Sequence, residues 1–102
     1  MQTIFLPPRV GKTYALIDIA HRDGLYIITK DIKEARRVFE LAQKVNKKVR
    51  FPMTYDDIKR GKFIGTDTET ILIDDADEFI EFMCKPLAVR AIALTRREGD
   101  LY

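Results

Sequence analysis

Residues 7–13 have the sequence PPRVGKT, and this stretch decides how the rest of the chain is interpreted. A short β-branched and aromatic run precedes it at residues 3–6, and apolar residues at helical spacing follow from Lys12 to Ala20. A strand, a tight loop ending in Gly-Lys-Thr and a helix are the context that a phosphate-binding loop requires. In such a loop the backbone N–H groups and the lysine bind phosphate oxygens, and the threonine hydroxyl ligates magnesium. The expected nucleotide contacts are Arg9, Val10, Gly11, Lys12, Thr13 and Tyr14.

A second stretch, ILIDD at residues 71–75, follows about 60 residues later. A buried apolar strand ending in two carboxylates is typical of the partner of a phosphate loop, where one acid binds magnesium and the next orients the attacking water. We therefore expect Thr13 and Asp74 to bind the metal and Asp75 to act in catalysis. Each stretch also has a plainer interpretation. The tripeptide fits an ordinary strand-to-helix turn, and the acids fit an N-cap and first turn of the next helix.

The remaining sequence alternates strand and helix patterns. Asp31 with Glu34, and Thr54 with Asp57, have the spacing of helix-capping boxes. Strands are expected at residues 3–6, 25–29, 49–51, 70–74 and 89–95, and helices at residues 12–20, 32–45, 54–59 and 76–84. This order predicts an α/β fold, a three-layer parallel sheet of about five strands with flanking helices, in a single domain over residues 1–102.

The same stretches resemble the motifs of one family of motor proteins. Residues 7–13 look like motif I of the superfamily 2 helicases, with Arg9 where a glycine is usual. Residues 74–77 resemble their D-E-A-D box, with Asp75 in place of the glutamate, and residues 91–95 resemble the strand that ends in their motif III threonine. The resemblance implies a truncated P-loop NTPase (RecA-like) core, with Thr95 at the γ-phosphate or its water. It also implies that residues 91–94 lie between the strands at residues 3–6 and 71–74.

The resemblance implies that the chain is a nucleotide-binding module that binds ATP or ADP with Mg²⁺. Helicase motors hold the nucleotide between two domains or subunits, and 102 residues leave no room for a second domain. ATPase activity is therefore expected to be weak, or to depend on a protein partner or a homo-oligomer. Arg96 and Arg97 are candidates to act in trans, or form a solvated basic end. The arrangement is similar to that of short P-loop proteins of bacteriophages, which suggests a place in phage DNA metabolism.

Two other functions stay open from the sequence. Leu6 and Arg9, at positions where glycine is usual, fit a degenerate P-loop scaffold that binds a protein partner such as a host or replication factor. Two basic clusters with an aromatic residue fit a protein that binds single-stranded nucleic acid. These clusters are Lys44, Lys47, Lys48 and Arg50, and Lys59, Arg60, Lys62 and Phe63. Magnesium-dependent binding of ATP would distinguish the nucleotide module from both alternatives.

Composition narrows the class of protein. With 46% hydrophobic and 33% charged residues, the chain has the composition of an ordinary globular protein, and no apolar run approaches the roughly 20 residues that span a bilayer. A cytoplasmic protein with no membrane partner is expected, in the host cytoplasm if a phage encodes it. Cys84 is the single cysteine and suggests neither a disulfide nor a zinc site. His21 is expected to cap the end of its helix rather than to act in catalysis.

Overall fold

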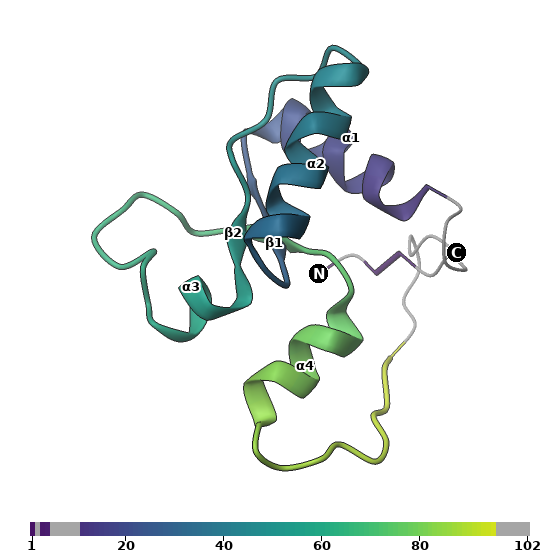
Figure 1. Cartoon of the computed structure of the whole chain (residues 1–102), viewed down its shortest axis with the longest axis vertical. Helices are drawn as coiled ribbons and strands as arrows, with labels where there is room; N and C mark the ends of the chain where they lie inside the picture. The colour runs from purple at the N-terminus through teal and green to yellow at the C-terminus, as the bar shows by residue number, and fades with distance from the viewer. Residues whose placement is uncertain (2, 5–10, 96–102) are drawn as a thin grey trace.

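The structure of the protein, a computed structural model, describes residue 1, residues 3–4 and residues 11–95 (Figure 1). In chain order the elements are α1 (Lys12–Asp23), β1 (Tyr26–Thr29), α2 (Ile32–Lys44), β2 (Met53–Thr54), α3 (Tyr55–Lys59), β3 (Ile71–Ile73) and α4 (Ala76–Cys84). The strands form one parallel sheet in the order β2-β1-β3. The expected α/β class, with parallel strands and flanking helices, is confirmed.

The register of the sheet brings the carboxyl ends of its strands to one edge. Ile28 in β1 pairs with Met53 on one side and with Ile73 on the other. The N–H of Asp74 donates to the carbonyl of Ile28 at 3.0 Å, which extends the pairing of β3 by one residue. Thr54 and Asp74 therefore leave the sheet together. We call this end of the sheet the carboxyl edge and the opposite end the amino edge.

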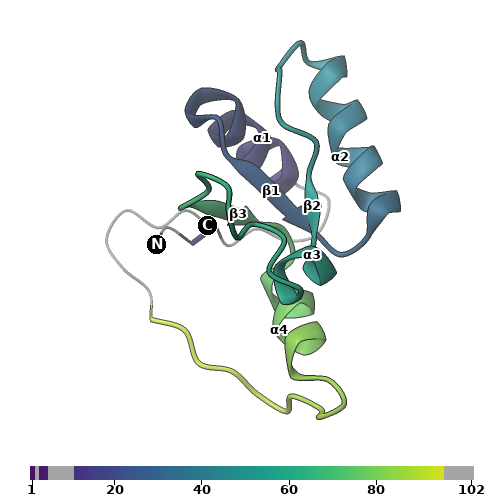
Figure 2. The same cartoon turned by 90° about the vertical axis from the view of Figure 1, so that its left-hand side faces the viewer.

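Helices α1 and α2 pack side by side on one face of the sheet (Figure 2). Both helices carry an apolar stripe, and the two stripes meet Ile27 of β1 in one buried cluster. The cluster consists of Leu16, Ile17, Ala20, Ile27, Val38, Ala42 and Val49. Because α1 is held by this apolar packing, its first turn has a fixed position relative to the ends of the strands.

The predicted capping boxes are present in full at α3 and in half at α2. At α3, the N–H of Asp57 donates to the Thr54 hydroxyl at 3.2 Å, and the N–H of Thr54 donates to the Asp57 carboxylate at 3.0 Å. At α2, the N–H of Glu34 donates to the Asp31 carboxylate at 2.9 Å. The Glu34 carboxylate accepts from Arg37 rather than returning to Asp31, so the box stays half formed.

Helices α3 and α4 lie beyond the carboxyl edge rather than over the second face of the sheet (Figures 1 and 2). The ring of Tyr55 in α3 meets Phe79 of α4 edge-on, with 5.1 Å between ring centroids, and lies 5.8 Å from Phe82. No residue of α4 is buried. Among the described residues, the expected third layer of helices is therefore not formed.

The predicted strand at residues 89–95 is wrong, and with it the sheet of about five strands. These residues are irregular, with Ile92 and Leu94 exposed at 49% and 57%. Strand formation depends on burial against neighbours more than on propensity, and the small side chains of Ala91 and Ala93 offer little apolar area to bury. The predicted position of residues 91–94 between two other strands is wrong for the same reason. The described residues hold a three-stranded sheet without the expected P-loop core.

Two further strand predictions differ from the structure in detail. The strand expected at residues 49–51 is wrong, because pairing with β1 begins at Met53, after Pro52. Proline has no N–H to donate to a ladder, so it precedes the strand. Of the strand expected at residues 3–6, Ile4 forms an isolated bridge and packs on the core, while residues 5 and 6 lie outside the described part of the chain.

Candidate functional site

The first turn of α1 begins at a glycine with an unusual backbone. Gly11 is the N-cap of α1 and has a φ of 92°, in the left-handed region. A Cβ at this position would meet nothing within 4 Å, so the backbone conformation rather than space calls for glycine. The described residues supply no side-chain cap to this helix and no acid in its first turn. Its N–H groups and the positive end of its dipole therefore favour an anion.

Two side chains of this turn reach the two acids that follow β3. The Lys12 ammonium donates to the Asp75 carboxylate in an ion pair. The Thr13 hydroxyl donates to Asp74 Oδ2 at 3.3 Å. The partners are 63 and 61 residues apart in sequence, so only the fold brings them together. The four residues predicted to form the centre of the site are thus in contact at the carboxyl edge.

Asp74 is a buried acid with an incomplete set of hydrogen bonds. It is 4% exposed, and its Oδ1 atom is buried with no hydrogen-bond partner among the described residues. Burial raises the pKa of Asp74, and the charge of Asp75 adds to this, while Lys12 and Thr13 act in the opposite direction. A buried carboxylate oxygen without a partner costs free energy that a bound cation or a proton would recover.

Asp75 differs from its neighbour in exposure and in partner. Its side chain is 35% exposed, and its backbone has a φ of 53°, a left-handed conformation that aspartate tolerates better than most residues. Although Asp75 is the N-cap of α4, its side chain makes no capping hydrogen bond. The carboxylate is turned to Lys12 instead, and the hydrogen bond and charge of Asp75 raise the Lys12 pKa. The plainer interpretation therefore holds for position, with Asp75 at the N-cap and Asp77 and Glu78 in the first turn of α4, but not for a side-chain cap.

Tyr55, at the start of α3, fixes the backbone that carries both acids. Its hydroxyl donates to the carbonyl of Asp74 at 2.7 Å and lies 3.0 Å from the carbonyl of Asp75. The side chain is buried, and burial raises its pKa well above the ordinary value for tyrosine. Sequence reasoning missed this residue because an aromatic residue in a capped helix carries no signal beyond a place in the core.

Arg37 of α2 is a second residue that the sequence did not single out. Its guanidinium donates to the Glu34 carboxylate at 3.0 Å, and its charge lowers the Asp74 pKa. The other predicted contacts are less informative. Tyr14 is exposed at 44%, and Arg9 and Val10 lie outside the described residues. Thr95 is exposed in the irregular segment, so its role at the γ-phosphate stays a prediction without the strand expected to position it.

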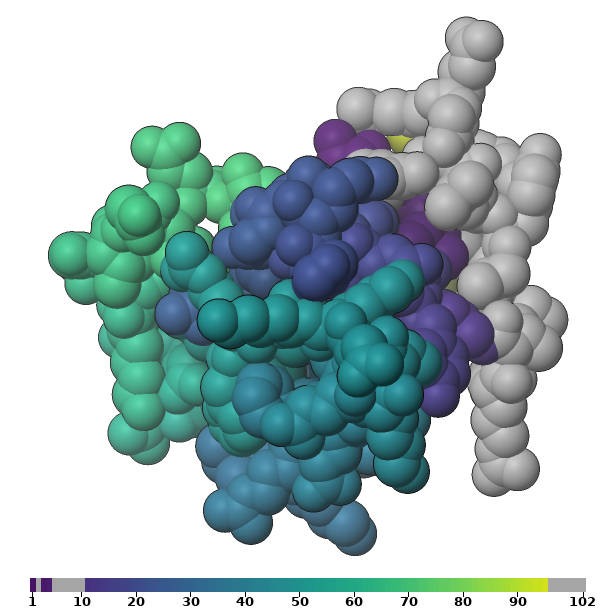
Figure 3. Space-filling model, turned by 90° about the horizontal axis from the view of Figure 1, so that it is seen from above, coloured from purple at the N-terminus to yellow at the C-terminus, as the bar shows by residue number. Residues whose placement is uncertain are grey.

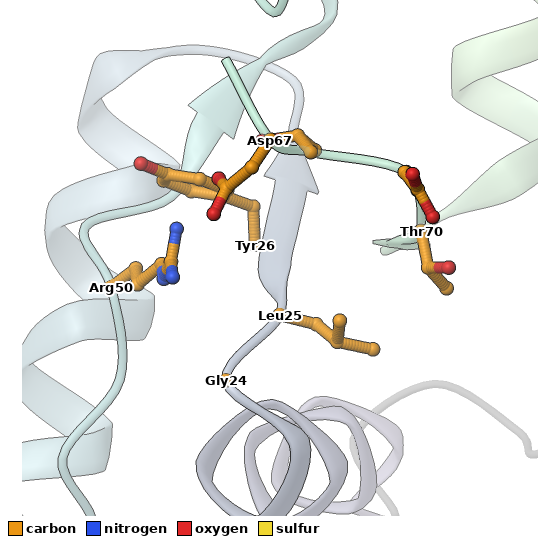
Figure 4. A pocket seen from close by; sticks show the side chains of 8 residues that line it. Gly24, Leu25, Tyr26, Arg50, Asp67 and Thr70 are labelled. Atoms are coloured by element: carbon orange, nitrogen blue, oxygen red, sulfur yellow. The ribbon is translucent and has the colours of Figure 1, made fainter.

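A separate pocket of about 180 Å³ lies at the amino edge of the sheet (Figure 4). It is lined by Gly24, Leu25, Tyr26, Arg50, Asp67, Thr68, Glu69 and Thr70. The guanidinium of Arg50 lies over the Tyr26 ring, with Cζ 5.1 Å from the ring centroid. Asp67 and Glu69 outnumber Arg50 in this pocket, so its net charge disfavours an anion.

The described residues contain no group of three or more His, Cys, Asp or Glu side chains arranged to hold a metal ion. Nor does this part of the chain include a helix with the length and apolar character needed to cross a membrane. At the carboxyl edge, the oxygens of Thr13 and Asp74 are the protein ligands available to a cation. Comparison of the chain with protein-family models, with curated proteins and with solved structures found no match.

Proposed function

We propose that this chain binds ATP or ADP with Mg²⁺ at the carboxyl edge, with its phosphates on Gly11, Lys12 and Thr13. The observation that carries the proposal is the contact of Lys12 and Thr13 with Asp75 and Asp74. A chance tripeptide at a turn would have no reason to meet a pair of acids more than 60 residues away. A cytoplasmic setting, where ATP and magnesium are available, is part of the proposal.

Because of the charges around the site, we expect the nucleotide to bind only together with magnesium. Lys12 and Arg37 face Asp74, Asp75 and Asp77, and Arg37 is also paired with Glu34. The negative side chains outnumber the positive ones, which disfavours a phosphate that arrives alone. A divalent cation offsets this excess of negative charge.

The residues present fit such a cation. Asp74 Oδ1 is a buried carboxylate oxygen without a partner in the described residues, and the Thr13 hydroxyl lies beside the same carboxylate. Magnesium prefers oxygen ligands and commonly takes only one or two from the protein, with phosphate and water supplying the rest. When bound, the ion would supply charge neutralisation at the phosphates.

Lys12 has to exchange Asp75 for a phosphate oxygen when the nucleotide binds. Both side chains are about one-third exposed, so the exchange requires no opening of the core. The exchange leaves Asp75 without its cation, close to the phosphates. Asp75 is one methylene shorter than the glutamate usual at such a position, so we propose weak hydrolysis that depends on a partner or a second copy of the chain.

Calorimetric titration with ATP and with ADP, each with and without magnesium, tests the proposal. The wild-type chain should bind both nucleotides with magnesium and bind neither measurably without it. Lys12→Ala should abolish binding, whereas Lys33→Ala should not change it, because Lys33 is an exposed lysine without a partner among the described residues.

Melting curves give a second readout of the same experiment. At a nucleotide concentration one hundred times the Kd, the folded state gains about 2.7 kcal/mol, which raises the midpoint of so small a domain by several degrees. If wild type and Lys12→Ala melt at the same temperature in millimolar ATP and magnesium, the proposal is refuted. The degenerate scaffold that binds a protein partner then takes its place.

A further inference from the structure

A groove of about 460 Å³ lies where α2 ends and the chain turns back toward β2. It is lined by Phe39, Gln43, Asn46, Lys47, Lys48 and Val49. Figure 3 looks down on this end of the molecule, where the end of α2 and the loop after it, in teal, face the viewer. Helix α2 starts just after the carboxyl end of β1, so its last turn lies toward the amino edge. The groove is therefore remote from Lys12 and Asp74.

Phe39 lines the groove and is paired with a second aromatic ring, Phe51. The rings of Phe39 and Phe51 lie with centroids 5.4 Å apart and an angle of 55° between their planes. Phe51 is 43% exposed, so part of its ring is open to a ligand. A half-exposed ring held by a second ring is a platform on which a flat apolar surface can stack.

The same segment is strongly basic. Residues 43–51 contain the cations Lys44, Lys47, Lys48 and Arg50 and no acid. Lys47 forms an ion pair with Asp18, and Arg50 lies over Tyr26. Lys44 and Lys48 are exposed and have no acidic partner in the described part of the chain. Lys48 lines the groove and Lys44 is the last residue of α2, next to Gln43, so two ammonium groups are available to an anionic ligand at this end of α2.

In the second basic cluster predicted from the sequence, most cations are already paired with neighbouring side chains. Arg60 pairs with Asp56 at 2.8 Å, and Lys62 pairs with Asp57 at 3.0 Å. Lys59 lies 5.5 Å from the centroid of the Phe82 ring. A polyanion would have to compete with these contacts, so the groove at the end of α2 is the better of the two basic surfaces.

The loop that carries these lysines is held in place. His21 Nδ1 lies 2.9 Å from the carbonyl oxygen of Lys48, and because a carbonyl accepts, Nδ1 carries the proton in this contact. His21 therefore ties the loop to the end of α1 rather than capping its own helix. The N–H of Lys47 donates to the carbonyl of Ala42 at 2.9 Å, and Asn46 has a left-handed φ of 55°. A preformed loop reduces the entropy lost when a ligand binds.

From these observations we propose that the groove at the end of α2 binds single-stranded nucleic acid. The phosphates lie on Lys44 and Lys48, a base stacks on Phe51, and the amides of Gln43 and Asn46 face base edges. An exposed ring near unpaired cations suits a strand whose bases are unstacked, whereas in a duplex the base faces are stacked inside and cannot stack on such a ring. The site does not depend on the nucleotide site at the carboxyl edge.

Fluorescence anisotropy of labelled oligothymidylate, oligouridylate and a duplex of equal length tests this proposal on the full chain at low salt. Both single strands should bind more tightly than the duplex. Lys44→Gln combined with Lys48→Gln should weaken binding about tenfold and make the salt slope shallower by about 1.4, the value for two lost contacts with a single strand. Phe51→Leu keeps an apolar side chain and should weaken binding roughly five- to a hundredfold without changing that slope.

Lys33→Gln is the matched control. Lys33 lies on the first turn of α2, about 16 Å along the helix from Lys44, so its removal changes net charge but not the groove. Binding by this variant should stay within about twofold of wild type. Three results would each overturn the proposal: no binding by wild type at low salt, a loss with Lys33→Gln as large as with the groove lysines, or a duplex bound as tightly as the single strands.

Discussion

Asp74 and Asp75 are adjacent in sequence, yet the fold gives them different environments. Asp74 points into the protein beside Thr13 and lacks a partner for one oxygen among the described residues, whereas Asp75 is one-third exposed and neutralises Lys12. In the proposed function, environment rather than residue type gives them different tasks, Asp74 toward the cation and Asp75 toward Lys12. Substitution of each aspartate by asparagine, which keeps the shape, separates the two tasks.

Asp75→Asn should strengthen the binding of ATP–Mg²⁺. The change removes the partner that Lys12 must leave and one of the negative charges near the phosphates. Asparagine tolerates the left-handed conformation at this position as well as aspartate does, so the turn should survive. A gain on the order of tenfold in affinity is expected from the loss of one close charge. A titration in which this variant binds more weakly than wild type would show that Asp75 contacts the nucleotide directly.

Asp74→Asn should stabilise the protein without ligand while removing the gain in nucleotide affinity that magnesium gives. The folded-state pKa of Asp74 is raised, so the folded protein holds its proton more tightly than the unfolded chain does. Stability from this group is therefore greatest at low pH and is lost as pH rises through the folded pKa. The variant should show a higher midpoint in urea at neutral pH and a smaller decline as pH rises from the unfolded-state to the folded-state pKa of Asp74. Equal pH profiles for both proteins would contradict this account.

At the scale of elements, α3 and the end of β3 are joined by one hydroxyl. Tyr55→Phe keeps the ring contacts with Phe79 and Phe82 but leaves the carbonyls of Asp74 and Asp75 without this donor. We expect a loss of about 1–3 kcal/mol in the free energy of unfolding, measured by urea denaturation. The nucleotide affinity should fall as well, because the acids lose their fixed backbone.

Tyr14→Phe is the control for this prediction. Tyr14 is 44% exposed on α1, and its hydroxyl has no partner among the described residues. Its removal should change the free energy of unfolding by less than about 0.5 kcal/mol. Similar losses in the free energy of unfolding for both variants would mean that the Tyr55 hydroxyl does not hold the backbone of the two acids.

The helices could be predicted from the sequence because their signals are local. The N-caps Asp31 and Thr54 and the apolar periodicity after Lys12 act within a few residues, and the helices form there. Strands depend on neighbours distant in sequence. Residues 89–95 have a strand-like composition but no partner strand among the described residues. Local patterns also do not specify that β2 begins after Pro52 rather than before it.

At the scale of the whole molecule, the sequence predicted that Lys12 and Thr13 lie near Asp74 and Asp75. It did not predict the residues that support this arrangement. The two acids follow β3 at the carboxyl edge, and the packing of α1 on the sheet brings Lys12 and Thr13 to them. Tyr55 and Arg37 come from elements whose position depends on tertiary packing, so no motif could reveal them. The groove at the end of α2 was visible only as a run of cations, because its aromatic pair forms from separate segments.

The isolated chain should bind ATP but hydrolyse it only slowly. Asp75 is occupied by Lys12 and is shorter than the glutamate usual at its position, and Arg37 is bound to Glu34. Among the described residues, no other arginine reaches the acids, so the stabilisation that an arginine finger supplies, about 10³ to 10⁵ in rate, is missing.

Phosphate release from saturating ATP–Mg²⁺ should therefore proceed far below the roughly 1–10³ per second of typical enzymes. Lys12→Ala, measured in parallel, reports any contaminating ATPase, since it should bind no nucleotide. Asp75→Glu restores the longer carboxylate, and release should rise if the reach of the acid limits hydrolysis. Turnover near one per second in wild type, lost in Lys12→Ala, would mean that the chain supplies the catalytic groups itself, and the residues outside the described part would then be the place to seek them.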